Sequence, residues 1–342
     1  MISTAQTASG AMAVIDAKAV RAEIGKDRLL KMYRQMLLIR RFEERASLAY
    51  DHKKIAGFLH AYIGQEAVQT GFYDHLDPKR DATVTSYRCH ALALLCGLDP
   101  KELMAELFGK VTGNVRGKGG SMHFFSKEKN MLGGHGIVGG QIPVGTGAAF
   151  SAKYRKTGGV SVTYLGDGAS PQGTFHESLN MASLWNLPAI YVIENNMYGM
   201  GTACTRASSV QDIAAAKAPG YNMASFTFDG LDLYASWKTA QQAIALARSG
   251  KPVLIEAKTY RYRGHSVSDA ATYRTKEEVD KYKLLDPIER IKADLVAEGW
   301  LTEAGVEQVE EQVMTQIMEA LKFSEESPEP PLSELMRHVY AE

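Results

Sequence analysis

The sequence has no uninterrupted apolar run of about 18 residues, so it predicts no transmembrane helix. It has only three cysteines, Cys89, Cys96 and Cys204, and their spacing matches neither a metal site nor a disulfide framework, which is typical of a reducing compartment. Lys+Arg and Asp+Glu are both 39, so no overall charge favours nucleic acid or an anionic membrane. We therefore expect neither as a partner.

Other absences narrow the function and the location. There is no GxxxxGK[ST] phosphate loop, which speaks against a Mg²⁺-nucleotide phosphotransferase. Residues 1–20 lack the apolar core and cleavage pattern of a secretory signal, and they hold one Lys and no Arg, which disfavours a mitochondrial transit peptide. We expect a cytoplasmic protein of a bacterium, and a mitochondrial matrix or plastid location only in a eukaryotic host.

The 342 residues divide into three predicted parts. Residues 1–26 form an N-terminal arm. Residues 27–270 form an α/β domain that begins with a helix, which Asp27 caps and which runs to about Tyr50. The last strand of this domain is predicted at residues 253–259. Residues 271–342 form a helical extension packed on the same domain. Its charged helices extend to about residue 323, before the breaker sequence SPEPP and a short closing helix.

Two short apolar runs frame a predicted crossover in the α/β domain. Residues 160–165 (VSVTYL) predict a buried strand that stops at Gly166, and residues 189–194 (AIYVIE) predict a second strand. Between them, Thr174 and Glu177 form a capping-box pattern that predicts the start of a helix. A strand–helix–strand crossover makes the two strands parallel, so their carboxyl ends face the same edge of the sheet.

Oxygen-bearing residues follow both predicted strands. Gly166-Asp167-Gly168 comes after the first, and Asn195-Asn196 comes after the second, with 26 residues between the two motifs. Asp167 offers a charged ligand and the Asn196 side chain a neutral one, as Mg²⁺ prefers, and the two glycines allow a phosphate to approach the backbone closely. Either motif alone is an ordinary turn or strand end. Together they predict a site for a cation and a diphosphate where open α/β sheets bind ligands.

This pattern resembles a known family. GDG followed about 26 to 30 residues later by NN is similar to the diphosphate-binding signature of thiamine-diphosphate enzymes. The flanking residues read GDGASPQGTFHESLNMASLWNLPAIYVIENNMYGMGT and look like the α subunits of the two-subunit 2-oxo acid dehydrogenase E1 family, those of pyruvate dehydrogenase above all. The resemblance extends from about Leu29 to the C-terminal Pro-rich segment.

The resemblance implies the thiamine-diphosphate-binding fold. We therefore expect an α/β protein with a mostly parallel central sheet, helices on both faces, an N-terminal helical arm and a helical C-terminal tail. It also implies thiamine diphosphate and Mg²⁺ as cofactors. The metal ligands would be Asp167, Asn196 and the backbone carbonyl of Tyr198, and the residues next to Asp167 that would contact the cofactor are Gly168 and Ala169.

Residues 133–147 (GGHGIVGGQIPVGTG) are dense in glycine. They formally contain a dinucleotide-binding G-x-G-x-x-G pattern, but no acidic residue follows about 20 positions later, which argues against a Rossmann site. The resemblance instead assigns Gly136 and Val138 to contacts with the aminopyrimidine ring, and Val138 would help to fix the bent shape of the cofactor. The plain alternative is a flexible loop between helices.

Three further segments carry candidate site residues. In Tyr87-Arg88-Cys89-His90, Arg88 can pair with a diphosphate oxygen and Tyr87 can bond another, whereas His90 is by default a structural histidine. His60 aligns with a family histidine near the reacting carbonyl, where an imidazole can bond the 2-oxo acid or a developing alkoxide. The neighbouring Gln65 is expected only to start a helix.

The third segment, residues 260–269 (YRYRGHSVSD), alternates aromatic and basic residues. It resembles the mobile phosphate-side loop of E1 α subunits, in which His265 contacts the diphosphate or substrate region. Ser266 occupies the position that is phosphorylated in mitochondrial enzymes, and a phosphate there adds about two negative charges beside a bound diphosphate. The chain departs from the common family pattern after Asp269 and is one residue shorter there, which leaves the order of this loop open.

The resemblance implies oxidative decarboxylation of pyruvate with reductive acetylation of a lipoyl group. A second module must hold the pyrimidine and supply a carboxylate, and this chain has one GDG…NN module only, so we expect a β subunit and an α₂β₂ heterotetramer. A lipoyl-bearing dihydrolipoamide acetyltransferase (E2) is the expected acceptor. The alternatives are an acetoin dehydrogenase α subunit, then a branched-chain 2-oxo acid E1 α subunit, and lastly a non-catalytic thiamine-diphosphate-binding module.

Overall fold

The computed structural model describes residues 15–337 and 339–340 of the chain. Residues 1–14, which make up much of the predicted N-terminal arm and most of the 1–20 segment examined for a leader, lie outside the described residues. The rest of the arm contains a helix, α1, at Ala17–Ile24, in agreement with the expected N-terminal helical arm. Within the described residues, no helix combines the length and the apolar character needed to cross a membrane.

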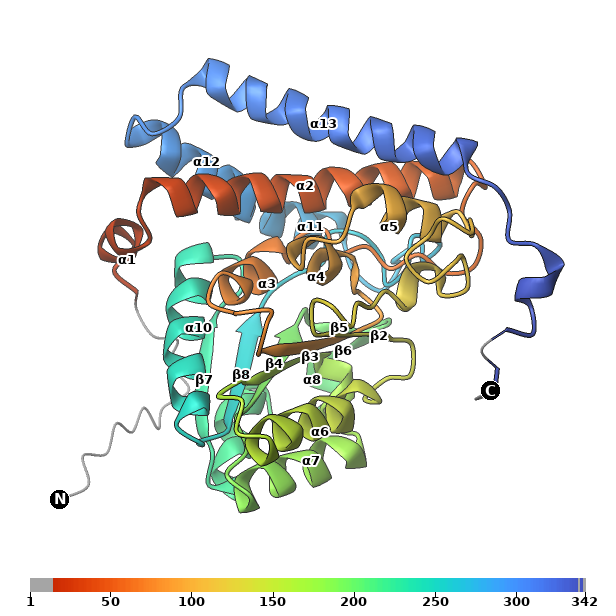
Figure 1. The fold of residues 1–342 in the computed structure, drawn as a ribbon. Helices are drawn as coiled ribbons and strands as arrows, with labels where there is room; N and C mark the ends of the chain where they lie inside the picture. Colours follow the sequence, from red (N-terminus) through yellow and green to blue (C-terminus); the bar gives the residue numbers. More distant parts are fainter. Residues whose placement is uncertain (1–14, 338, 341–342) are drawn as a thin grey trace.

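A six-stranded parallel sheet forms the centre of the molecule (Figure 1), as the resemblance implied. The strand order is β2-β1-β3-β4-β8-β7. The bounds are Ala82–Ser86 for β1, Met131–His135 for β2, Ser161–Gly166 for β3, Ala189–Asn195 for β4, Ala224–Asp229 for β7 and Val253–Lys258 for β8. The predicted strands at 160–165, 189–194 and 253–259 are therefore confirmed.

Helices cover both faces of the sheet (Figure 1). The core on one face contains residues of α2 (Lys26–Asp51), α3 (Glu66–Tyr73), α4 (His90–Leu95), α5 (Pro100–Leu107), α10 (Leu233–Arg248), α12 (Pro287–Ala297) and α13 (Glu303–Glu326), and α13 packs on α2 and α5 rather than on the sheet. The other face packs against α6 (Gln141–Tyr154), α7 (Gly173–Leu184) and α9 (Ile213–Lys217). The short elements are α8 (Cys204–Ala207), α11 (Lys276–Lys283), the hairpin β5–β6 (Tyr198–Gly199 and Thr202–Ala203) and the 3₁₀ turns η1 (Gly120–Met122), η2 (Asp167–Ala169), η3 (Ala218–Tyr221) and η4 (Leu332–Glu334).

The strands are apolar on both sides because both sides are covered. Ile190 and Val192 of β4 point into the core on the α2 side, whereas Tyr191 and Ile193 point into the core on the α6 side. All four are fully buried. A parallel strand that is buried on both faces reads as a continuous apolar run rather than an alternating one, which is why β3 and β4 could be predicted from sequence.

Two predicted helix caps are wrong, although the helices themselves exist. Helix α7 begins at Gly173 with Gln172 as its N-cap, and no side chain caps it, so Thr174 already lies inside the first turn and cannot form the predicted capping box with Glu177. Helix α2 likewise begins after Gly25, which places Asp27 in the first turn. There its charge still suits the positive end of the helix.

Helix α6 lies so close to the sheet that only glycine fits at Gly145. A Cβ atom there would lie 1.9 Å from Thr163 Oγ1 and 3.0 Å from Val84 Cγ1, whereas a Cβ atom at Gly147 on the same helix would meet nothing within 4 Å. The two positions share a helix and differ only in what surrounds them.

We expect Gly145→Ala to destabilise the protein and Gly147→Ala to leave it as stable or more stable. Overpacking costs about 1–3 kcal/mol, which outweighs the gain of about 1 kcal/mol from replacing glycine in a helix. Urea unfolding of the two purified variants measures the difference directly. Equal stability of the two variants would contradict the packing of α6 on β1 and β3.

Candidate functional site

The parallel pairing of β3 with β4 brings Asp167 and Asn196 to one edge of the sheet. Gly166, the last residue of β3, is in register with Glu194, and each predicted ligand begins the segment after its strand. Burial raises the pKa of Asp167 to about 6, and the backbone amides of Asp167 and Asn196, together with the charge of Arg261, oppose that rise. The carboxylate therefore lies buried and close to Asn196, as the crossover predicted.

A positive group lies between two of the three predicted metal ligands. Arg261 Nη1 donates to Asn196 Oδ1 at 2.8 Å and to the carbonyl oxygen of Tyr198 at 2.5 Å. The Arg261 side chain is 1% exposed, and its charge also acts on Asp167. The amide and carbonyl oxygens thus converge on one cationic group beside a carboxylate. This donor set fits Mg²⁺, which takes hard oxygen ligands.

The sequence reading missed two residues of this arrangement. Arg261 was noted only as part of the aromatic and basic run at 260–269. That run was the one sequence feature that pointed to Arg261 as a site residue. Gln65 was expected only to start a helix, and it is indeed the N-cap residue of α3. Its Oε1 also accepts a hydrogen bond from Asn196 Nδ2 at 3.2 Å, which turns the Asn196 oxygen toward Arg261.

Three other predicted residues form a compact aromatic cluster. The ring centroids of His60 and Tyr87 are 4.7 Å apart, those of His60 and His265 are 5.1 Å apart, and those of Tyr87 and His265 are 5.3 Å apart. The residues come from the segment before α3, the end of β1 and the loop after β8, so the fold brings together three segments that are distant in sequence.

Both histidines of the cluster are held in the neutral form. Burial, together with the positive charge of Arg88, lowers the pKa of His60 to about 3 and the pKa of His265 to about 4. The Nδ1 atoms of both rings are buried and have no hydrogen-bond partner among the described residues. A neutral imidazole with an unused ring nitrogen is suited to binding a polar ligand group.

Arg88 connects two of these segments. Its Nη1 donates to the carbonyl of Ala61 at 2.8 Å, and its Nη2 donates to the carbonyl of His265 at 2.6 Å. Arg88 is 4% exposed. The guanidinium thus links the His60 segment to the His265 loop. The sequence predicted only a contact between Arg88 and the diphosphate, and not this structural role.

The glycine-dense segment, residues 133–147, begins within β2, a strand that the sequence reading did not predict, and continues into α6. Ser86 is in register with His135, so Gly136 and Val138 leave the sheet at the same edge as Tyr87. Val138 is 45% exposed. His123, which the sequence reading did not single out, lies beside this segment, since a Cβ atom on Gly136 would be 3.3 Å from its Cε1 atom.

The loop after β8 is ordered around Asp269. This carboxylate accepts hydrogen bonds from the His265 amide at 2.7 Å and from the Tyr273 hydroxyl at 2.8 Å, and Arg261 Nη2 donates to the same hydroxyl at 2.7 Å. The Ser266 hydroxyl lies 2.9 Å from that of Ser268 and is buried. The loop that carries His265 is thereby linked to the residue that holds Asn196.

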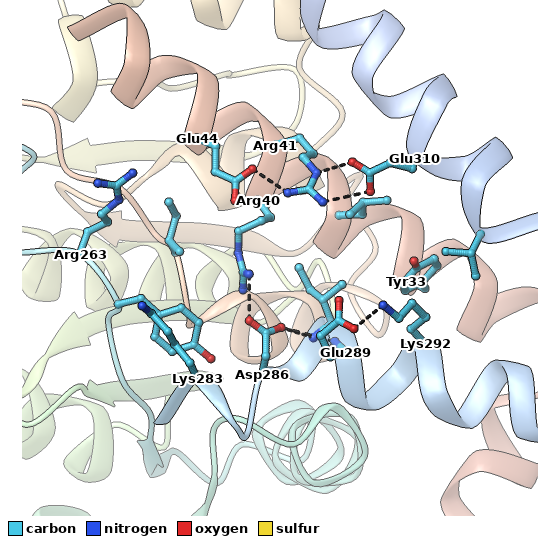
Figure 2. Close-up of a pocket in the computed structure, with 15 residues that line it drawn as sticks. Tyr33, Arg40, Arg41, Glu44, Arg263, Lys283, Asp286, Glu289, Lys292 and Glu310 are labelled. Atoms are coloured by element: carbon cyan, nitrogen blue, oxygen red, sulfur yellow. Dashed lines mark hydrogen bonds and ion pairs between the residues drawn. The ribbon is translucent and has the colours of Figure 1, made fainter. Parts of the chain in front are cut away.

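A cavity of about 600 Å³ lies outside this site, between α2, α12, α13 and the segment at Tyr262 (Figure 2). Its charged lining residues are mostly paired with one another. Arg40 bonds Asp286 at 2.9 Å, and Arg41 bonds Glu310 at 2.5 Å and Glu44 at 2.7 Å. None of the predicted site residues lines this cavity. We therefore place the functional site at the sheet edge and not in the cavity.

Fold and site together define an α/β protein whose candidate ligand site lies at the carboxyl edge of a parallel sheet. The family profile described as "Dehydrogenase E1 component" matches residues 34–333. The chain belongs to this family, whose members depend on thiamine diphosphate.

Relatives match nearly the whole chain. A protein of Rickettsia felis named "Pyruvate dehydrogenase E1 component subunit alpha" is 45% identical over 327 residues, which cover 95% of this chain and 100% of the relative. A protein of Rhizobium meliloti with the same name is 48% identical over 320 residues, covering 93% and 91%. A chloroplastic "subunit alpha-3" of this enzyme from Arabidopsis thaliana is 43% identical over 326 residues, covering 93% and 76%.

Between about pH 7 and about pH 5, we expect the free energy of unfolding to fall less in the His60→Gln variant than in the natural protein. The pKa of His60 is about 3 in the folded chain, against an ordinary 6.5 when unfolded. As the pH falls below 6.5, the unfolded chain takes up a proton that the folded chain does not, so the free energy of unfolding falls until the pH reaches about 3. By about pH 5 this costs up to about 2 kcal/mol.

Urea unfolding at several pH values measures this slope. His52→Gln, at an exposed position at the end of α2, is the matched control and should keep the slope of the natural protein. If His60→Gln gives the same slope as His52→Gln, then burial does not hold His60 neutral.

Proposed function

We propose that the chain is the α subunit of a pyruvate dehydrogenase E1 component. With Mg²⁺, thiamine diphosphate and a β subunit, it carries out the oxidative decarboxylation of pyruvate and the reductive acetylation of a lipoyl group on an E2 acyltransferase. The observation that carries the proposal is the convergence at one sheet edge of the Asn196 and Tyr198 oxygens, the Asp167 carboxylate and the cluster of His60, Tyr87 and His265.

We assign the roles at this edge as follows. Asp167, Asn196 and the carbonyl of Tyr198 hold the metal ion, and the metal ion holds the diphosphate. Further contacts with the cofactor come from Tyr87, Arg88, Gly136, Val138, Gly168, Ala169 and His265. Support for the metal assignment comes from Arg261, whose guanidinium already bridges two of the three oxygens.

The bound cofactor supplies the chemistry that stabilises the carbanion left by decarboxylation. The contribution of the chain is to bind and to orient. His60 and His265 are neutral at pH values near 7, so each ring can donate one N–H to an oxygen that becomes negative during the reaction, without itself carrying a charge. Burial of this cluster also removes water, which strengthens those hydrogen bonds.

An exposed apolar surface supports the proposed assembly with a β subunit. Phe150 and Tyr154 of α6 are 48% and 79% exposed, and the Phe150 ring lies 5.8 Å from that of Trp185, which is 43% exposed. An exposed apolar patch of this kind is typical of a protein interface. We propose that it is covered within an α₂β₂ heterotetramer, which in turn binds the lipoyl-bearing E2 component.

Location and regulation follow the same proposal. We propose a bacterial cytoplasmic location, supported by the bacterial relatives and by three buried cysteines that form no disulfide. Phosphorylation of Ser266 would place charge beside the diphosphate. Because Ser266 is buried, we propose that a kinase could reach it only after the 260–274 loop opens.

The proposal is tested on the chain purified from its own host together with any bound subunit. We expect ferricyanide reduction with Mg²⁺ and thiamine diphosphate to be driven by pyruvate, and the chain without its partner to be inactive. A preference for acetoin would favour an acetoin dehydrogenase α subunit, and a preference for a branched-chain 2-oxo acid would favour a branched-chain 2-oxo acid E1 α subunit. No turnover despite bound cofactor and partner would favour a non-catalytic module.

The metal assignment is tested in the same complex. Asp167→Ala should abolish Mg²⁺-dependent retention of thiamine diphosphate, because the site loses its one carboxylate ligand. Asp51→Ala removes an exposed carboxylate at the end of α2 and should bind the cofactor normally. Unchanged cofactor binding in Asp167→Ala would remove Asp167 from the metal ligands.

The assembly surface is tested by Gly147→Leu. Gly147 lies on α6 three residues before Phe150, and in the chain alone a Cβ atom there would meet nothing within 4 Å. We expect the variant to fold, because leucine favours a helix over glycine, but to lose its partner subunit in pull-down and sedimentation experiments. Gly220→Leu, at another open position, should keep the partner. Normal assembly of the Gly147 variant would place the interface elsewhere.

A further inference from the structure

Buried polar groups hold the backbone at His60–Tyr62 from three directions. Ser121 Oγ accepts a hydrogen bond from the His60 amide at 3.2 Å, and Glu43 Oε1 accepts one from the Tyr62 amide at 2.8 Å. Arg88 donates to the carbonyl of Ala61 between them at 2.8 Å. In segments without regular structure, backbone amides and carbonyls normally form hydrogen bonds with water. The three hydrogen bonds between buried side chains and residues 60–62 therefore need an explanation.

Two of the three anchors are joined by His90. Its Nδ1 atom lies 2.8 Å from Glu43 Oε2, and its Nε2 atom lies 3.0 Å from both the carbonyl oxygen and the hydroxyl of Ser121. Glu43 and His90 are fully buried, and Ser121 is 6% exposed. Helix α2, helix α4 and the turn η1 are thereby linked through one line of side chains.

The positions of the protons in the hydrogen bonds that link Glu43, His90 and Ser121 follow from the groups that can only accept. The Ser121 carbonyl can only accept, so His90 Nε2 carries a proton and donates to it. The other hydrogen bond, between His90 Nδ1 and Glu43, holds one more proton, wherever it lies along the bond. Glu43 and His90 together are therefore neutral overall, as full burial requires, because an isolated charge there would be costly.

An acid–histidine–serine line also suggests a nucleophilic triad, but its geometry is wrong for one. The Ser121 hydroxyl faces the His60 amide, and the acid and the histidine have no access to solvent. A nucleophile must reach a substrate atom, and here the end of the line meets the backbone of His60 instead.

We propose that Glu43, His90 and Ser121 are positioning residues for His60. They fix the backbone on both sides of Ala61, so that the His60 ring stays within the cluster of Tyr87 and His265. The inference rests on the proposed function, in which His60 contacts the reacting groups. A catalytic group misplaced by about 1 Å can lower the rate on the order of a hundredfold. This explains why several buried side chains form hydrogen bonds with the backbone of only three residues.

The least disruptive test is Ser121→Ala in the assembled complex. The variant removes the acceptor for the His60 amide and leaves the Glu43–His90 pair its bond to the Ser121 carbonyl. We expect kcat to fall on the order of tenfold, while KM for pyruvate and the affinity for thiamine diphosphate change less than twofold. Ser324→Ala is the matched control, since Ser324 is equally buried but bonds only the carbonyl of Ala320 within α13.

A pair of variants at Glu43 separates positioning from a need for charge. Glu43→Gln can still accept from the Tyr62 amide and can donate to His90 Nδ1, so the line remains satisfied and neutral, and we expect most of the activity to remain. Glu43→Met has a similar volume and no such groups, and we expect it to lose kcat at least as strongly as Ser121→Ala. Strong loss in Glu43→Gln would contradict a purely positioning role.

Hydrogen exchange gives a readout that does not depend on the substrate. The amides of residues 58–63 should exchange faster in Ser121→Ala than in the natural chain, and at the natural rate in Ser324→Ala. If the natural complex did not turn over pyruvate, the proposed function would fail while this comparison still tested the anchoring. Natural kcat and natural exchange in Ser121→Ala would overturn the inference.

Discussion

The in-register pairing of β3 with β4 is the constraint on which the site depends. It sets Gly166 beside Glu194, so that Asp167, one residue after Gly166, and Asn196, two residues after Glu194, emerge at the same edge. Because the two faces of each strand pack against different helices, a slip of one residue would exchange the side chains that fill the two cores. Packing far from Asp167 and Asn196 therefore secures the geometry of the proposed metal site.

Buried carboxylates then fix the loops that the sheet alone would leave free. Glu43 holds the Tyr62 amide, and Asp269 holds the His265 amide. Glu106, fully buried, accepts from four backbone amides of the 113–120 loop, which leads to Ser121. A buried acceptor of this kind is stable only when its partners are in place, so each carboxylate favours one loop conformation. Loops close to the site thus gain an order that their glycine content would not provide.

The sequence predicted the features that local patterns encode and missed those that need tertiary contact. The strands β3, β4 and β8, and the placing of Asp167 beside Asn196, follow from apolar runs and from the handedness of a crossover. Three of the five residues of strand β2 are polar or small, and the segment becomes a strand only by pairing with β1. Arg261 and Gln65 reach Asn196 across 65 and 131 residues of chain, and no local signal reports contacts of that range.

The isolated chain presents only part of a cofactor site. Asp167, Asn196 and His60 are buried and Tyr87 and His265 are half-buried, whereas Ile137 is 78% and Val138 is 45% exposed just after β2. A ring held against these residues would keep one face in water, and an aromatic ring gains most of its binding free energy from full burial. Under the proposed contacts of Gly136 and Val138 with the cofactor, a second protein surface would close the site over the 136–139 turn. The exposed aromatic residues of α6, the helix that follows this turn, lie where such a surface would continue.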